Sequence, residues 1–248
     1  MKFCINCDAP VSGKYCHECG QKTNIKRLDF KGLTEEISYF FTHIEKGFLR
    51  TSKEFIIHPG VTSLNYLKGK RKNYQKPVSY FLIWVGLYIL VHNMIINRFH
   101  YEYILSAADQ IPRHAEANLF LRKHFSLFLL PLLIVSAISV WLVLARPRFY
   151  FIEIVVLMLY GGGTYFMMTL ASDIVLGVLL RININHYHVF LWQTILSALY
   201  NAWFTYDFFR RSPPRYFWLR MILVALLVSV SGLLLMEYLP LAWLNIFP

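Results

Sequence analysis

All four cysteines of the chain lie within its first twenty residues, as two Cys-x-x-Cys pairs. Cys4 pairs with Cys7 and Cys16 with Cys19, and Gly20 permits the tight turn that the second pair needs. Four thiolates arranged in a tetrahedron select zinc and leave no position for a catalytic water. The spacing therefore predicts a structural zinc ribbon over residues 1–24, in which the metal folds a module too small for a core of its own.

Two other states of these cysteines are open, two disulfides or four free thiols. A reducing cytosol disfavours disulfides, so that alternative depends on the compartment. His17 is a fifth candidate ligand, but it stands between two cysteines of one turn and is expected to face solvent.

A second group of chemically interesting residues is ionisable and lies inside apolar stretches. His92, Asp173 and Glu237 would form a layer toward the outer face of a membrane bundle, whereas Glu153 and Asp207 would lie toward its inner face. Charged groups at membrane depth usually face the protein interior or a cavity, which predicts a cation or proton site. The alternative is that each group lies at an interface, is hydrated, or pairs with an arginine.

A basic run precedes the first long apolar stretch. Its cations are Lys68, Lys70, Arg71, Lys72 and Lys76. Each cation near a membrane surface contributes about 1 kcal/mol to the binding of anionic lipid headgroups. The alternative is a topology signal and nothing more. Nucleic acid is disfavoured as a partner because Lys2, Lys14 and Lys22 are the ribbon's few cations beside Asp8 and Glu18.

The composition points to a membrane protein. Of the 248 residues 56% are hydrophobic and 16% are charged, against about 25% charged in soluble domains, and the net charge is +11. Five stretches are long enough to cross a bilayer, which needs roughly 20 apolar residues. They are residues 78–96, 125–145, 149–180, 189–209 and 217–239.

The third stretch is longer than one crossing needs and contains Gly161, Gly162 and Gly163. It is predicted to be a single tilted or kinked crossing with an extension, and the glycines to be a hinge or a close-packing site. Five crossings with the N-terminus inside place the basic run, Arg146, Arg148 and the Arg210–Arg215 loop in the cytosol, as the positive-inside rule requires. The C-terminus then lies outside.

An amphipathic helix is predicted between the ribbon and the basic run. Leu33, Ile37, Phe40, Ile44 and Phe48 form its apolar stripe, and Pro59-Gly60 ends it. The stripe would lie on the inner leaflet or pack on the bundle or another subunit. The predicted domains are thus the ribbon at 1–24, a connector and basic hinge at 25–77, and a five-span domain at 78–248.

Three motifs in this order resemble an uncharacterised bacterial family of zinc-ribbon, multi-pass inner-membrane proteins with a domain of unknown function. They are the two cysteine pairs with Gly20-Gln21, then His58-Pro59-Gly60, then the run from Gly69 to Pro77. The motifs cover about the first 80 residues. The resemblance implies an inner-membrane location and a zinc ribbon, and it brings no activity or substrate.

The expected fold is therefore an all-α, five-helix transmembrane bundle with a small N-terminal zinc ribbon. We found no Ser/His/Asp constellation, HExxH, P-loop or GxSxG motif, so the sequence does not favour an enzyme. The leading expectation is an interaction protein that binds a cytosolic partner at the membrane. A transporter or a homo-oligomeric pore, of the kind a defence effector uses, is the second expectation, and a lipid-modifying enzyme the third.

Overall fold

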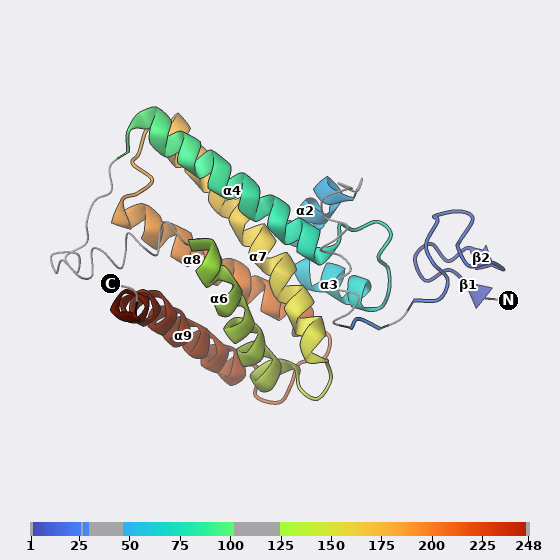
Figure 1. Cartoon of the computed structure of the whole chain (residues 1–248). Coiled ribbons are helices and arrows are strands. Elements are labelled where there is room, and N and C mark those ends of the chain that lie inside the picture. Colours follow the sequence, from blue (N-terminus) through green and yellow to red (C-terminus); the bar gives the residue numbers. More distant parts are fainter. Residues whose placement is uncertain (1, 26, 30–46, 102–124, 247–248) are drawn as a thin grey trace.

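The computed structural model describes residues 2–25, 27–29, 47–101 and 125–246, and in these segments the chain is mostly helical (Figure 1). Two short strands form the N-terminal ribbon, and helices follow to the C-terminal end. The elements are β1 (Lys2–Phe3), β2 (Pro10–Val11), α2 (Phe48–Ile57), α3 (Pro59–Leu67), α4 (Pro77–Phe99), α6 (Phe125–Val140), η2 (Trp141–Ala145), α7 (Phe151–Asp173), η3 (Ile174–Leu179), α8 (Tyr187–Phe209) and α9 (Phe217–Ile246).

Long helices lie where the sequence predicts five apolar stretches. Two of them, α4 and the continuous α7–η3 helix, are long and apolar enough to cross a membrane. Shorter apolar helices, Leu129–Ala145 and Phe217–Gly232, belong to α6–η2 and α9. Only 22% of the apolar window of α4 is buried, so this helix exposes far more apolar surface than the core helix of a soluble protein.

Contacts between side chains give the relative directions of the helices. Tyr80 bonds Thr164 and His92 bonds Asp173, so α4 and α7 run parallel. Gln193 at the start of α8 reaches the same Asp173 at the end of α7, so those helices are antiparallel. The N-terminal ends of α4, α7 and α9 therefore gather beside the C-terminal ends of α6–η2 and α8. We call this the ribbon end, because the N-terminal strands lie on this side (Figure 1).

The glycine triplet does not break α7, which continues through it as a helix. A Cβ at Gly163 would lie 2.7 Å from the Tyr80 ring, and one at Gly161 would lie 3.0 Å from the Phe204 ring. The triplet is therefore a close-packing site at which α4 and α8 approach α7, which is how small residues serve helix contacts in membranes.

Pro59 begins a further helix instead of ending the region. Proline suits the first helical turn because its missing NH would have no intrahelical partner there. The α2–α3 pair packs among α4, α7 and α8, with the ring of Phe55 stacked 4.3 Å from that of Tyr160. Of the predicted apolar stripe, Leu33, Ile37, Phe40 and Ile44 lie outside the described residues, and Phe48 stacks on Trp84 of α4.

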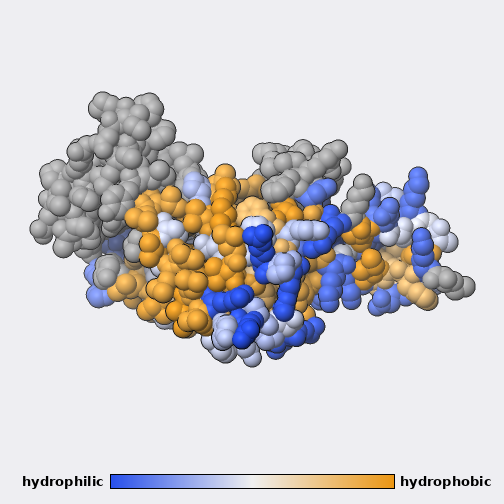
Figure 2. All heavy atoms as spheres, turned by 90° about the horizontal axis from the view of Figure 1, so that it is seen from below, coloured by the Kyte–Doolittle hydropathy of each residue, from blue (hydrophilic) through white to orange (hydrophobic). Residues whose placement is uncertain are grey.

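The outer surface of the helices is strongly apolar. Figure 2 shows hydrophobic residues over much of the helical part and hydrophilic residues gathered toward the ribbon. The exposed apolar side chains include Leu90, Met94, Leu130, Leu142, Phe190, Leu199, Leu219 and Leu226. Contiguous apolar surface on several helices marks a protein that contacts lipid or another protein there.

Candidate metal centre and the surface beside it

The ribbon is built from two turns with the same backbone hydrogen bonds. The NH of Asp8 donates to Cys4 O and the NH of Gly20 donates to Cys16 O, both over 2.9 Å. Asp8 and Gly20 both have positive φ, 59° and 69°. Gly20 is the residue that the sequence marks for this conformation. Asp8 takes it too, because aspartate is one of the few side chains that tolerate the left-handed region.

The four cysteine sulfurs meet in one place. All lie within 4.8 Å of one another, and the Cys4–Cys19 and Cys7–Cys16 Sγ distances are both 3.6 Å. The four thiols are free, so the spacing brings together a cluster that can bind a metal ion.

Backbone hydrogen bonds favour the thiolate form of two of these cysteines. Burial alone raises the pKa of Cys4, but backbone hydrogen bonds from Cys7 and Asn6 bring this pKa down to about 7. A backbone hydrogen bond from Cys19 likewise lowers the pKa of Cys16. The pKa of Cys7 is instead raised to about 12, because the backbone bond from Ala9, which lowers it, is outweighed by burial and by contacts with the other thiols. A metal ion binds thiolate and not thiol, so the turns favour the ligand form at Cys4 and Cys16.

Gln21 fastens the ribbon to the basic run. Its amide nitrogen donates to Gly69 O over 2.9 Å, and its amide oxygen accepts from the NH groups of Arg71 and Lys72 over 3.2 and 3.0 Å. The side chain is buried, and three of its four possible hydrogen bonds are made to one turn of the basic run. The position of Gln21 next to Cys19-Gly20 is visible in the sequence, but its partner is not.

The five cations of the basic run are placed differently by this turn. Lys68 and Arg71 line a cavity beneath the ribbon, and Lys72 lies against Gly20. Lys76 precedes the first turn of α4, where Pro77 stands, and Lys70 is half-buried and does not line the cavity. Only part of the basic run therefore faces the cavity, and the spacing of the cations in the sequence does not show which of them do.

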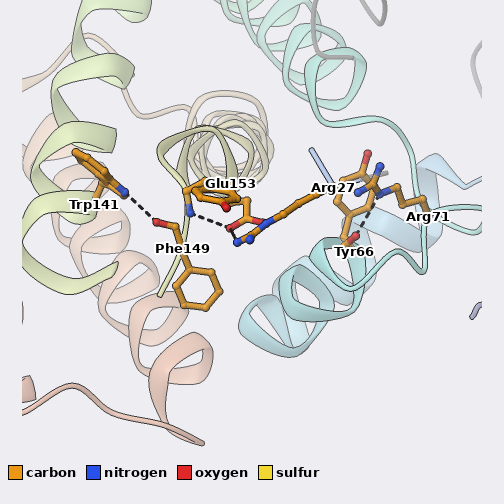
Figure 3. Close-up of polar contacts among 7 residues, drawn as sticks. Arg27, Tyr66, Arg71, Trp141, Phe149 and Glu153 are labelled. Carbon is orange, nitrogen blue, oxygen red and sulfur yellow. Dashed lines mark hydrogen bonds and ion pairs between the residues drawn. The ribbon is translucent and has the colours of Figure 1, made fainter. Parts of the chain in front are cut away.

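Arg27 and Glu153 form a second link between the N-terminal segment and the bundle (Figure 3). The guanidinium donates to both carboxylate oxygens, over 2.7 and 2.9 Å, and lies 3.6 Å from the centre of the Tyr150 ring. Glu153 also accepts from Tyr150 N, which closes the first turn of α7. The sequence predicts that Glu153 pairs with an arginine or stays hydrated. Its arginine partner lies 126 residues away, which no local pattern indicates.

The structure brings together two of the three residues of the polar site predicted in the apolar helices, His92 and Asp173. Asp173 is fully buried, and its oxygens lie 2.7 Å from His92 Nδ1 and 2.7 Å from Gln193 Nε2. The side chain of Glu237 lies outside the described part of the structure. Gln193 is a partner that sequence inspection missed, because a single glutamine in an apolar helix carries no motif.

Asp207 has a structural role at the ribbon end. Its Oδ2 accepts from the NH groups of Gly60 and Val61 over 2.8 and 3.1 Å, which caps the N-terminus of α3. Its Oδ1 lies 3.0 Å from Arg210 Nε. A carboxylate at this position satisfies otherwise unpaired NH groups and interacts favourably with the helix dipole.

Comparison with protein families finds one match, to a family described as a protein of unknown function (DUF3667), over residues 45–89. The matched segment contains α2, α3, the basic run and the first part of α4. Comparison with curated proteins and with solved structures finds no match. The match is compatible with the resemblance seen in the sequence, and it covers the unit in which α2 and α3 pack onto the bundle.

Proposed function

We propose that this protein is a five-span membrane protein that holds a cytosolic protein at the membrane through a zinc-bound ribbon. The observation that carries the proposal is the attachment of the metal module to the bundle. Gln21 and Arg27 anchor the ribbon, while its side chains Phe3 and Tyr15 remain 62% and 57% exposed. An anchored module with exposed aromatic residues is suited to protein binding.

Two observations support the five crossings. Successive long helices run in opposite directions, and the basic run, Arg146, Arg148 and the Arg210–Arg215 loop lie together at the ribbon end, which becomes the cytosolic side. A helix of 23 residues, such as α4, spans about 35 Å against a hydrocarbon core of about 30 Å. A bacterial inner membrane is the location that the sequence resemblance implies.

Zinc as the bound ion is supported by the arrangement of the sulfurs. Four Zn–S bonds of about 2.3 Å in a tetrahedron separate the sulfurs by about 3.8 Å. Two Sγ distances in the ribbon are 3.6 Å and all four sulfurs lie within 4.8 Å of one another, so little movement is needed to bind the ion. The role of the ion is structural, since all four positions are taken by the protein.

The docking proposal is tested by affinity purification from cells at matched membrane abundance. We compare the natural chain with Phe3→Ser/Tyr15→Ser, and use Leu49→Ser as the control because Leu49 is exposed on α2 and not on the ribbon. Quantitative mass spectrometry should find a soluble protein enriched with the natural chain and the control and lost with the ribbon variant. Equal capture by all three contradicts the proposal.

Transport is a second candidate, favoured by the buried His92–Asp173 pair. Polar groups at this depth are costly and are often retained for ion or proton movement. Against an open conduit, the described residues at the ribbon end pack Phe55, Tyr160 and Phe204 between the helices. Transport predicts that Asp173→Asn abolishes flux and leaves ribbon-dependent capture intact, whereas docking predicts that the same change acts only through stability.

A further inference from the structure

A cavity of about 460 Å³ lies between the ribbon and the helical bundle. Pockets of about 300–1,000 Å³ are the size that holds small organic ligands. The walls come from segments far apart in the sequence: the ribbon with the residues just after it, α3, the basic run, and the loop before α7 with the first turn of that helix. Their apolar members are Ile5, Ile25, Leu64, Leu67 and Phe149.

The charged residues of the cavity are mostly cations. Arg27, Lys68, Arg71 and Arg148 line it together with a single carboxylate, that of Glu153. The carboxylate is already engaged by Arg27 through two hydrogen bonds, so it adds little repulsion toward an anion. Lys68, Arg71 and Arg148 therefore leave the cavity with an excess of positive charge.

The surroundings hold two of these cations in place. Arg71 donates to Tyr66 O over 3.4 Å and lies over the Tyr66 ring, as Figure 3 shows for the polar contact. Arg148 Nη1 donates to Ser212 Oγ over 3.0 Å from the neighbouring loop. Gln21 fixes the turn between Gly69 and Lys72 from above. Side chains held in this way lose less conformational entropy when they bind a ligand.

We propose that this cavity binds a phosphate group that carries an apolar chain. A phosphate offers at least three acceptor oxygens, which suits donors arriving from several directions, and arginine binds it with its planar fork. The apolar walls accept the attached chain. At the ribbon end the cavity lies near the level of lipid headgroups in the five-span arrangement, so the ligand is an anionic phospholipid of the inner leaflet or a soluble phosphate ester with an apolar tail.

This inference rests on the membrane location within the proposed function, but it does not depend on a protein partner. Its test uses the purified full chain, so failure here leaves the docking experiment unaffected. The ligands are dioleoyl phosphatidylglycerol, dioleoyl phosphatidylcholine and octyl phosphate, each added to protein in a nonionic detergent. Native mass spectrometry counts the bound ligand per chain, and titration gives the affinity.

The variant pair Lys68→Gln/Arg148→Gln removes two cations from the cavity wall. The matched pair Lys70→Gln/Arg146→Gln removes the same charge from the same two segments, but neither residue lines the cavity. We expect the first pair to weaken binding of the anionic ligand by about tenfold or more and the matched pair by less than about twofold. Zinc content and thermal unfolding verify that both pairs fold. If the Lys68→Gln/Arg148→Gln variant does not fold, Lys68→Glu replaces it, because this is a single change at an exposed residue.

The ligands separate the two sources of phosphate. Phosphatidylglycerol bound at one molecule per chain, with phosphatidylcholine excluded, supports a membrane lipid. Octyl phosphate that binds with the same dependence on Lys68 and Arg148, while phosphatidylglycerol does not, supports a soluble ester. Equal weakening by both variant pairs means that diffuse surface charge attracts the ligand, and this result contradicts the proposed site. Binding that neither pair changes contradicts it as well.

Discussion

At the scale of single residues, Gly60 is the glycine with the least room for a side chain in the described part of the chain. A Cβ there would collide with the backbone of Asp207 and Phe208, where α3 meets α8. Backbone atoms cannot yield as a flexible side chain does, so we expect Gly60→Ala to destabilise the protein by about 2 kcal/mol or more. Thermal unfolding in detergent measures the loss. Gly86→Ala is the control, because no atom lies within 4 Å of its added Cβ, and it should change stability by less than about 1 kcal/mol.

The Arg27–Glu153 ion pair should respond unequally to loss of its two partners. The Arg27 side chain is 51% exposed and regains water when Glu153 becomes glutamine, whereas Glu153 is 5% exposed and cannot regain it when Arg27 is lost. We expect Arg27→Gln to cost about 1–3 kcal/mol and Glu153→Gln to cost less. Adding Glu153→Gln to Arg27→Gln should recover part of the loss in the same unfolding measurement. Equal costs for the two single variants contradict this account.

At the scale of elements, the ribbon should retain its metal when its attachment is removed. Gln21→Ala deletes the three hydrogen bonds to the basic run but leaves all four cysteines. We expect the variant to keep about one metal ion per chain and to be cleaved faster by trypsin between Lys68 and Lys72. Thr23→Val is the control, since it removes one bond within the ribbon, to Gly13 O, and should leave cleavage unchanged.

The metal itself should depend on the cysteines. The variant Cys16→Ser/Cys19→Ser should lose the metal and keep the bundle helical, as metal analysis and circular dichroism can verify.

The contact between α2 and the end of the basic run should depend on alkaline pH. Burial and a hydrogen bond of 2.8 Å to Glu54 raise the pKa of Tyr74 from 10.0 to about 12. A group whose pKa is raised on folding stabilises the folded state below its unfolded pKa, so this contribution is present below pH 10 and is lost between pH 10 and 12. Tyr74→Phe should reduce the fall in stability over this window by about 2 kcal/mol, measured by unfolding at each pH. If stability falls as much in Tyr74→Phe as in the natural chain, the pKa of Tyr74 is not raised by folding, which contradicts this prediction.

At the scale of the whole molecule, the five-span arrangement predicts which loops are accessible from outside the cell. A cysteine at Ile182, between η3 and α8, should react with a membrane-impermeant maleimide on intact cells. A cysteine at Ser212, between α8 and α9, should react only after the membrane is opened. Labelling of Ser212→Cys from outside would mean that the chain is inverted or crosses a different number of times.

The exposed apolar surface of α4, α6, α8 and α9 is a property of the whole molecule and explains its high hydrophobic content. A soluble chain of 248 residues that is 56% hydrophobic would bury most of these side chains, yet Leu90, Leu199 and Leu226 remain exposed. Such a surface contacts lipid or another protein, and two of the helices are long and apolar enough to cross a membrane.

The sequence alone was sufficient for two features, the helical architecture and the cysteine cluster. The structure confirms that the chain is mostly helical and that Cys4, Cys7, Cys16 and Cys19 lie together. Both are local properties, because a long apolar stretch must satisfy its own backbone as a helix and paired cysteines need only a tight turn. Zinc, the five crossings and the partner remain predictions.

The tertiary structure alone decided how these parts are joined. The bonds from Gln21 to Gly69 and from Arg27 to Glu153 join residues 48 and 126 positions apart. Phe55 of α2 likewise packs against Tyr160 of α7 and Phe204 of α8, two helices that come much later in the chain. No periodicity encodes such pairs, since each depends on which surfaces complement each other once the helices have formed. The cationic cavity exists only because four separate segments converge at one end of the bundle.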